Sequence, residues 1–241
     1  MAWVDAHGDS RWVYRGLGDT LFTLISGVGR VGGYSLVNER TILEIFERRA
    51  TEFVDTHRLV PWDSLALAQH HGLPTRLLDW TTNPLVAAFF AVSSEPGTIE
   101  VVPPGSRQGV SARTKVRPEP KNVPARVVAC RVASKDMIDP LLDKDPFALS
   151  TIKFLMPRVL TTRITTQSGL FSVHPNPEAP WTEPLALSDH VFDVPGEMRG
   201  YFQRKLFYLG VDDQRIMGGL DGLCRRLAWQ YNARIGLGAV R

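Results

Sequence analysis

Few cysteines and no long apolar run occur in this sequence. Cys130 and Cys224 are the only cysteines among 241 residues and lie far apart, which excludes a disulfide framework and a cysteine-based zinc site. We expect both to be small core residues. No stretch approaches the roughly 20 apolar residues of a membrane helix, and the first residues lack the basic-then-apolar layout of a signal peptide. We therefore expect a cytoplasmic protein with no membrane partner.

Several catalytic motifs are also missing. The sequence has no G-x-x-x-x-G-K-[ST], no G-x-S-x-G and no HExxH, so a phosphate-loop NTPase, a nucleophile-elbow hydrolase and a zinc protease are excluded, and no metal is predicted. Residues 27–32 do satisfy G-x-G-x-x-G. However, residues 33–35 separate them from the next helix, whereas a dinucleotide site needs the last glycine to open that helix. We therefore predict a glycine-rich loop there.

The charge is nearly balanced but unevenly distributed. The chain has 28 basic and 25 acidic residues, and its 44% hydrophobic share is enough for a core. Between Arg107 and Arg131, seven basic residues face one acid, Glu119. The prolines and glycines of the same region predict a long basic loop over residues 103–125. Two interpretations stay open: a solvated surface loop, or a loop that contacts the phosphates of RNA, DNA or a nucleotide.

The hydrophobic periodicity places helices early and strands late. Gly72 is expected to end one helix in a left-handed conformation, and Asn83 followed by proline is expected to start another. The predicted helices cover 38–56, 63–72, 83–93, 197–209 and 220–231, and the predicted strands cover 12–14, 98–102, 126–132, 162–165, 170–174 and 190–194. Without βαβ alternation, this order predicts an α+β fold in a single domain, 1–241.

Three blocks of the sequence resemble the FRG-domain family, named after a Phe-Arg-Gly near its start. Tyr14-Arg15-Gly16 stands in that place, within the first block, 12–16. The second block, 65–91, contains the long run LAQHHGLPTRLLDWTTNPLVAAFFA, and the third, 163–175, contains RITTQSGLF. FRG domains are similar in arrangement to ADP-ribosyltransferases. The resemblance therefore implies a split antiparallel β core, with helices mainly from the N-terminal half.

The same resemblance implies a function. It suggests an enzyme with NAD as substrate, which transfers ADP-ribose to a macromolecule or hydrolyses NAD, and which acts as a toxin or phage-defence effector. Its partners would be an acceptor such as RNA, DNA or a protein, and an antitoxin or inhibitor protein. The alternative is a non-catalytic module that binds a nucleotide or nucleic acid. Gln167 favours the alternative, because it stands where the superfamily usually has a glutamate, and an amide is not a base.

The first two blocks supply the residues expected to bind NAD. Arg15 is suited to grip phosphate oxygens with its guanidinium, and Gly16 would let the backbone approach the nicotinamide amide. Tyr14 or Trp80 would stack on the nicotinamide ring, and the Thr81 hydroxyl would brace the site. Two further residues of the central block, Arg76 and Asn83, complete the expected cofactor-binding set.

The expected catalytic set is Arg15, Gln167, Asp79 and His71. Gln167 would bond a ribose hydroxyl, and a nearby acid would supply the charge that Gln167 lacks. Asp79 is one candidate, although it has a structural alternative in which it pairs with Arg76 and staples a turn between two helices. Three later acids are further candidates: Glu178, Glu183 and Glu197.

His70 and His71 close the helix at 63–72. Adjacent helical positions point in different directions, so a shared metal is not expected. One histidine is expected to be a buried hydrogen-bonding strut, and the other to line the cleft and exchange protons near pH 7.

Overall fold

The computed structural model describes residues 2–30, 32–55, 59–97, 99–101, 114–116, 118–158 and 169–236. The predicted strand at 162–165, Gln167 and most of the predicted loop at 103–125 lie outside these residues. Within them the fold is mixed α+β, as predicted, with one six-stranded antiparallel sheet in the order β6-β7-β2-β1-β5-β8 and a separate β3–β4 pair.

The strands are β1 (Trp12–Leu17), β2 (Leu77–Thr81), β3 (Ile99–Val101), β4 (Thr114–Val116), β5 (Ala125–Arg131), β6 (Lys153–Leu155), β7 (Gly169–Val173) and β8 (Val191–Val194). The α-helices are α1 (Ala2–Ala6), α2 (Leu36–Ala50), α3 (Pro61–His70), α4 (Pro84–Ser93), α6 (Glu183–Ala186), α7 (Arg199–Tyr208), α8 (Asp213–Met217) and α9 (Gly219–Asn232). In the described part of the chain, four α-helices precede residue 94 and four follow residue 182. The expectation that helices come mainly from the N-terminal half is therefore wrong.

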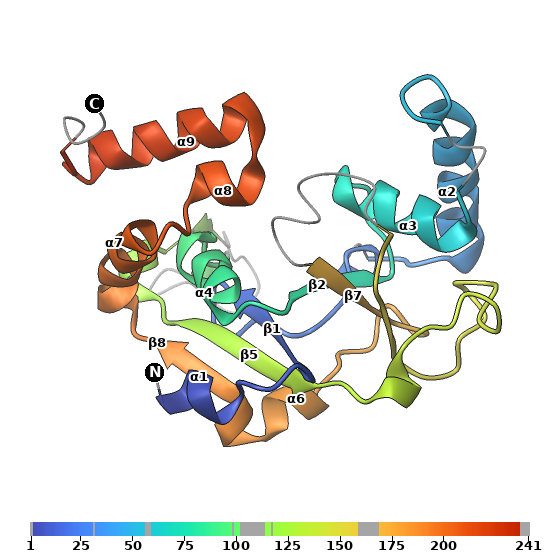
Figure 1. Ribbon diagram of the computed structural model, residues 1–241, viewed down its shortest axis with the longest axis horizontal. Helices are drawn as coiled ribbons and strands as arrows, with labels where there is room; N and C mark the ends of the chain where they lie inside the picture. Colours follow the sequence, from blue (N-terminus) through green and yellow to red (C-terminus); the bar gives the residue numbers. More distant parts are fainter. Residues whose placement is uncertain are drawn as a thin grey trace, which may run out of the picture.

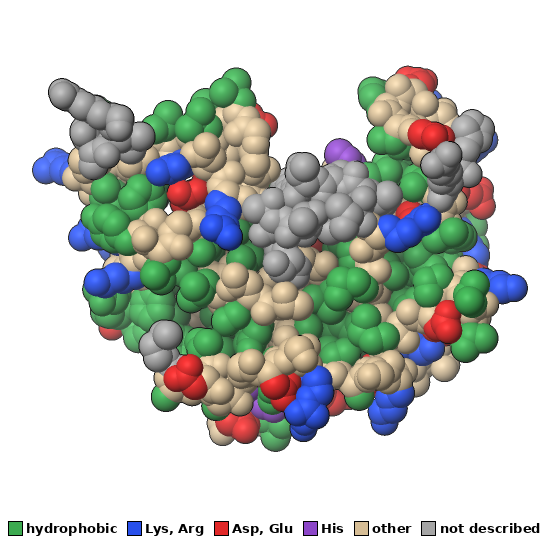
Figure 2. All heavy atoms as spheres, in the orientation of Figure 1, with side chains coloured by type: hydrophobic (Ala, Val, Ile, Leu, Met, Phe, Trp, Pro, Cys, Tyr) green, Lys and Arg blue, Asp and Glu red, His purple; other side chains and the backbone are tan. Residues whose placement is uncertain are grey.

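Most of the longer helices form two groups above the sheet, whereas the short helices α1 and α6 lie below it (Figure 1). Figure 1 shows α2 and α3 on one side and α7, α8 and α9 on the other, with α4 lying over β1 between them. The space-filling view in Figure 2 shows the surface hollowed between these two groups. None of the helices in the described ranges is long and apolar enough to cross a membrane.

The sheet divides between β1 and β2. These two strands are joined by one register pair, Tyr14 with Thr81, whereas β1 pairs with β5 from Trp12 to Leu17 and β2 pairs with β7 from Leu77 to Thr81. After Tyr14 the last three residues of β1 therefore have no partner on β2. The division leaves room between the two halves of the sheet, and the side chains of both strands border that space.

Two predicted helix ends are confirmed. The Asn83 side chain accepts a hydrogen bond from the Leu85 amide at 2.9 Å, so it caps α4 ahead of Pro84. Gly72 has a φ of 88°, a left-handed conformation that favours glycine. There the Leu73 amide donates to the Ala68 carbonyl at 3.0 Å and closes the end of α3.

Other local predictions need correction. The helix predicted over 63–72 begins earlier, at Pro61, so Asp63 lies inside α3, where its carboxylate accepts from the Val60 amide at 2.9 Å. The turn expected between the second and third helices is the strand β2, because residues 77–81 pair with β7. The region predicted as a basic loop contains β4 and a short 3₁₀ turn at Pro120–Asn122.

The glycine-rich segment is a turn, as its context predicted. A 3₁₀ turn spans Val28–Arg30, and α2 begins only after Ser35, whose side chain accepts from the Asn38 amide. At Gly29 a Cβ would overlap the backbone of Pro177, so close packing explains this glycine. The segment does not open a helix toward a ligand, and the dinucleotide-binding interpretation stays rejected.

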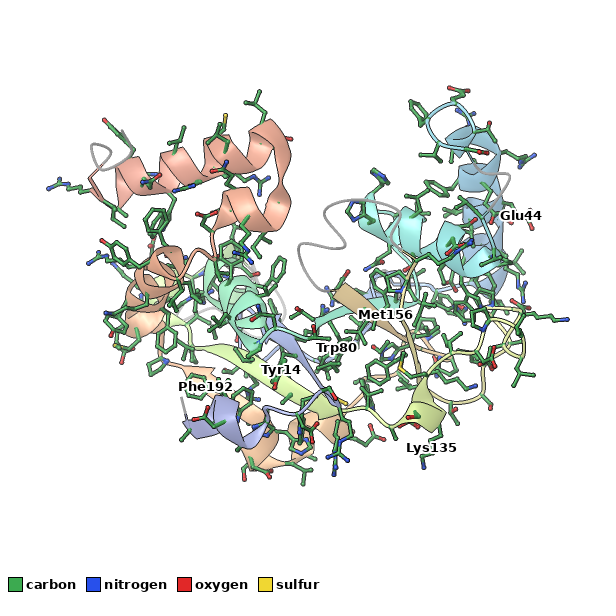
Figure 3. The ribbon with its side chains drawn as sticks, viewed as in Figure 1. Tyr14, Glu44, Trp80, Lys135, Met156 and Phe192 are labelled. Atoms are coloured by element: carbon green, nitrogen blue, oxygen red, sulfur yellow. The ribbon has the colours of Figure 1, made fainter. Side chains whose placement is uncertain are left out.

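Apolar side chains fill both faces of the sheet. Tyr14 is buried under α4, whereas Trp80 is buried with Phe154 on the opposite face (Figure 3). Cys130 is a buried core residue, and burial raises the pKa of its thiol to about 12. Cys224 is exposed on α9, so its expected place in the core is wrong.

Candidate functional site

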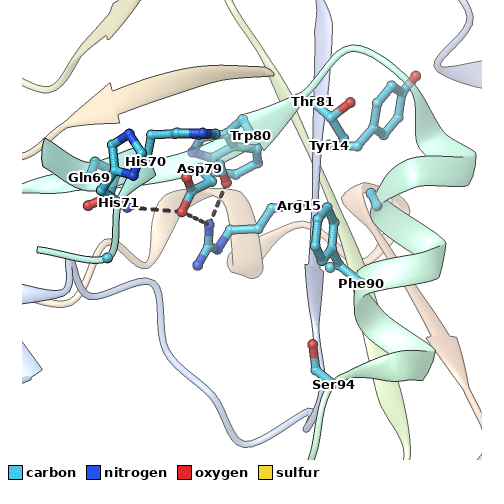
Figure 4. A pocket seen from close by; sticks show the side chains of 13 residues that line it. Tyr14, Arg15, Gln69, His70, His71, Asp79, Trp80, Thr81, Phe90 and Ser94 are labelled. Carbon is cyan, nitrogen blue, oxygen red and sulfur yellow. Dashed lines mark hydrogen bonds and ion pairs between the residues drawn. The ribbon is translucent and has the colours of Figure 1, made fainter. Parts of the chain in front are cut away.

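A cavity of about 630 Å³ opens where the sheet divides. Its volume is within the range of small-molecule and cofactor sites. Its walls come from β1, β2, the end of α3 and one face of α4, as Figure 4 shows. The residues that line it are Tyr14, Arg15, Gly16, Gln69, His70, His71, Gly72, Asp79, Trp80, Thr81, Ala87, Phe90 and Ser94. Seven of the predicted site residues are therefore brought together: Tyr14, Arg15, Gly16, His71, Asp79, Trp80 and Thr81.

Arg15 is the charged group at the centre of this cavity. One guanidinium nitrogen, Nη1, donates to the backbone carbonyl of Asp79 and lies 3.8 Å from the Asp79 carboxylate, and 15% of the side chain is exposed. Burial lowers the pKa of Arg15, the Asp79 charge opposes that change, and the positive charge of Arg30 adds to it. Arginine nevertheless keeps its proton at neutral pH. Arg15 is thus a desolvated cation facing the cavity.

The Nε of Arg15 has no hydrogen-bond partner in the described residues, although it is buried. Buried polar groups in folded proteins are nearly always hydrogen-bonded, and a charged donor without a partner is costly. The described residues therefore leave this donor unsatisfied in an arginine that lines the cavity.

Asp79 lies beside Arg15 and is held from the other side by α3. The Gln69 amide nitrogen donates to the Asp79 carboxylate at 3.0 Å, and 62% of the Asp79 side chain is exposed. Glu178, Glu183 and Glu197, the other acids considered, are exposed and do not line the cavity. The structure therefore favours Asp79 among these acids, whereas Gln167 lies outside the described residues.

Arg76 does not pair with Asp79. Arg76 lies just before β2 and is buried, with 1% of its side chain exposed. Its guanidinium binds the Glu39 carboxylate through Nε at 3.1 Å and Nη2 at 2.6 Å. Tyr34 donates to the same carboxylate at 2.9 Å. The predicted staple between Arg76 and Asp79 is wrong, and Arg76 fixes α2 to β2 without lining the cavity.

The two aromatic residues expected to stack on a ligand are buried in the core. The Tyr14 hydroxyl donates to the His7 carbonyl, and the Trp80 indole donates to the Ser172 hydroxyl at 2.9 Å. Only 3% of Tyr14 and 2% of Trp80 is exposed, so neither ring offers a free face. Both residues line the cavity, but strand alternation directs their rings into apolar layers, and their stacking role stays a prediction.

Phe90 provides the aromatic surface that the sequence analysis did not assign. It is half-buried on α4, borders the cavity and lies one helical turn before Ser94 on the same face (Figure 4). The signal was present in the sequence, because Ala87, Phe90 and Ser94 follow the spacing of one helical face. Gln69 was likewise visible in the central block without an assigned role.

Gly16, Thr81 and Asn83 have local structural functions. A Cβ at Gly16 would lie within 3.0 Å of backbone atoms of Ala87 and Ala91, so the missing side chain lets α4 pack on β1. This position faces α4, so packing, and not ligand approach, explains the glycine. The Thr81 hydroxyl accepts from the Asn83 amide at 3.1 Å, which braces the start of α4.

Both histidines border the cavity. His70 is half-buried and His71 is exposed, and their rings meet edge to face at 5.0 Å. Neither histidine is fully buried, so the expected buried strut is not found, and both line the cavity where only one was expected to. The proton-exchange role of His71 stays a prediction. Among the residues that the structure describes, no group of three or more His, Cys, Asp or Glu could hold a metal ion.

A buried polar pair lies near Arg15 on β7 and just after it. The Ser172 hydroxyl and the Nε2 of His174 are 2.9 Å apart, and 1% of His174 is exposed. Burial, aided by the positive charge of Arg15, lowers the pKa of His174 to about 4. His174 is therefore neutral at pH 7. It does not add a second positive charge near Arg15.

The fold and cavity define an α+β protein with a cationic pocket large enough for a nucleotide. The comparison with known families gives the more specific result: the chain carries an FRG domain over residues 10–98. This span includes Arg15, Gln69, Asp79 and Phe90, so the described site residues come from the domain itself. No curated protein and no solved structure matched the chain.

Proposed function

We propose that this protein is an NAD-dependent enzyme of the ADP-ribosyltransferase type, which acts on a macromolecule, nucleic acid or protein, as a toxin or phage-defence effector. The observation that carries the proposal is Arg15, a buried cation with an unpartnered Nε in a nucleotide-sized cavity. A carboxylate and an aromatic face border the same space. The order of the sequence blocks, which resembles that of ADP-ribosyltransferases, supplies the choice of NAD.

The roles follow from the positions of the side chains. Arg15 would bind a phosphate oxygen of NAD, and Phe90 would stack on the nicotinamide ring. Cleavage of the bond between nicotinamide and ribose builds positive charge on the ribose. The Asp79 carboxylate would stabilise that charge or accept a hydrogen bond from a ribose hydroxyl. His71, at the mouth, would exchange a proton with the acceptor.

Binding of NAD tests the first role. Calorimetric titration of wild type and Arg15→Gln should show an affinity loss of about 100-fold, because charged hydrogen bonds contribute about 1.5–3 kcal/mol each. Arg126→Gln is the matched control, because this arginine pairs with Asp193 on the surface, away from the cavity lining. Equal affinity in wild type and Arg15→Gln would remove Arg15 from the site.

Asp79→Asn separates binding from chemistry. The amide preserves the shape and one acceptor oxygen, so NAD affinity should stay within a few-fold, while nicotinamide release should fall because the negative charge is lost. NAD binding without release in the wild-type protein would favour the non-catalytic nucleotide-binding module. Neither the acceptor nor an inhibitor protein partner is needed for this distinction.

A further inference from the structure

A directional chain of hydrogen bonds leads from β2 to Asp79. The Leu77 amide donates to the Thr75 hydroxyl at 3.1 Å, and the Thr75 hydroxyl donates to the Gln69 side-chain oxygen at 2.7 Å. The Gln69 side-chain nitrogen then donates to the Asp79 carboxylate at 3.0 Å (Figure 4). The Thr75 hydroxyl and the Gln69 side-chain amide each accept one hydrogen bond and donate another, and the Asp79 carboxylate is the final acceptor.

Hydrogen-bond chemistry fixes the direction of this chain. An ionised carboxylate only accepts, so the Gln69 nitrogen must face Asp79. The Gln69 oxygen then faces Thr75, whose single hydroxyl proton is available because the backbone amide of Leu77 donates to that hydroxyl. Reversal of the Gln69 amide would set its oxygen against the carboxylate, which is repulsive.

The fold holds the inner members of the chain rigidly. Thr75 is 2% exposed, and its carbonyl accepts from the Val28 amide at 3.1 Å, which ties it to the 3₁₀ turn at Val28–Arg30. The left-handed Gly72 reverses the backbone between Gln69 and Thr75, so that the two side chains meet. The buried end of the chain is thus anchored, and only its Asp79 end reaches the cavity.

Gln69 also competes with Arg15 for the carboxylate. Arg15 Nη1 is 3.8 Å from the Asp79 carboxylate, longer than a hydrogen bond, whereas the Gln69 contact is 3.0 Å. Without Gln69, the Asp79 carboxylate would lose the hydrogen bond that fixes its position beside Arg15. The contact therefore keeps a cation and an anion side by side, both available to one substrate.

We propose that Gln69, oriented by Thr75, is a positioning residue that holds the Asp79 carboxylate against the ribose of NAD. The inference rests on the function proposed above. It assigns to Gln69 an effect on turnover and not on the binding of the dinucleotide as a whole. A misplacement of about 1 Å at a reacting centre lowers rates by about 100-fold.

Steady-state nicotinamide release tests the proposal with four variants. Gln69→Leu and Thr75→Val should lower kcat about 100-fold and about tenfold, with NAD affinity within about threefold of wild type. Thr75→Ser, which keeps the hydroxyl, should restore kcat. Gln203→Leu is the control, because Gln203 donates to the Val92 carbonyl at 3.0 Å and does not line the cavity. Unchanged kcat in Gln69→Leu, or equal losses in Thr75→Ser and Thr75→Val, would overturn it.

A readout without turnover separates this inference from the proposed function. The side-chain amide signals of Gln69 in a ¹⁵N NMR spectrum should shift in Asp79→Ala and in Thr75→Val, but not in Gln203→Leu. Wild-type protein that shows these shifts yet neither binds NAD nor releases nicotinamide would refute the function and retain the hydrogen-bond chain. Gln69 signals that stay unchanged in Asp79→Ala would refute the role of Gln69 in positioning the Asp79 carboxylate.

Discussion

Replacement of Gly16 by alanine gives the sharpest test of why the family motif ends in glycine. An added Cβ would lie within 3.0 Å of the Ala87 carbonyl oxygen and the Ala91 amide nitrogen, whereas ordinary contact begins at 3.4 Å. Both atoms belong to the backbone of α4, so no side-chain rotation relieves the overlap. The Cβ would lie 2.1 Å from the Ala87 oxygen, so the helix must move away from β1 by roughly 1 Å. Overpacking of this kind costs about 1–3 kcal/mol or more.

We therefore expect Gly16→Ala to lower the free energy of unfolding by about 3 kcal/mol, the upper part of the usual range for overpacking. Urea denaturation followed by tryptophan fluorescence measures the change. Gly200→Ala is the matched control: Gly200 lies in α7 with nothing within 4 Å of an added Cβ, and alanine should stabilise the helix by up to about 1 kcal/mol. A loss below about 1 kcal/mol in Gly16→Ala would refute the packing explanation and return Gly16 to a ligand-binding role.

Three further predictions concern stability and binding. Arg199→Met should lower the free energy of unfolding by at least about 3 kcal/mol, because the buried guanidinium donates to carbonyls at the end of α4, such as that of Ala91 at 3.0 Å. A loss under about 1 kcal/mol, as for a substitution on the surface, would contradict this. The depressed pKa of His174, about 4 against 6.5, means that stability is full above pH 6.5 and falls as the pH drops toward 4. Wild type should thus lose about 2 kcal/mol more than His174→Gln between pH 7 and pH 5 in urea titrations, and parallel losses would exclude His174. Phe90→Leu should weaken NAD binding about threefold to tenfold in calorimetry without unfolding the protein, whereas unchanged affinity would remove the stacking role.

Much of the region that lines the cavity could be predicted from the sequence, because its signals are local. Gly72 and Asn83 act through turn and cap chemistry within a few residues, so their roles follow from residue type. Arg15 was predicted at the end of a strand, 12–14, which the structure extends to Leu17, and its place in a cleft was expected from the block that contains it. These are cases in which neighbours in sequence decide the structure.

The missed features depend on partners that are distant in sequence. Residues 77–81 form a strand because β7, about 90 residues later, pairs with them, and a short run between two helices gives no sign of that partner. Arg76 lies just before β2 and binds Glu39 on α2 instead of Asp79. The burial of Tyr14 and Trp80 follows from strand alternation, which the sequence analysis did not extend through the motif.

The sequence alone also could not identify which acid borders the cavity. Asp79, Glu178, Glu183 and Glu197 are equivalent candidates when only residue types are compared. The division of the sheet between β1 and β2 selects Asp79, because it places β2 on the wall opposite Arg15. A tertiary feature, one register pair between two strands, thus decides which carboxylate borders the ligand space.

Release of nicotinamide from NAD tests the central claim most directly. Purified wild type, Arg15→Gln and the Arg126→Gln control would be incubated with NAD alone and with total bacterial RNA, DNA or lysate proteins as acceptors. The account predicts release by wild type and by Arg126→Gln, and its loss in folded Arg15→Gln. No release by wild type with any acceptor, or undiminished release by Arg15→Gln, would contradict it.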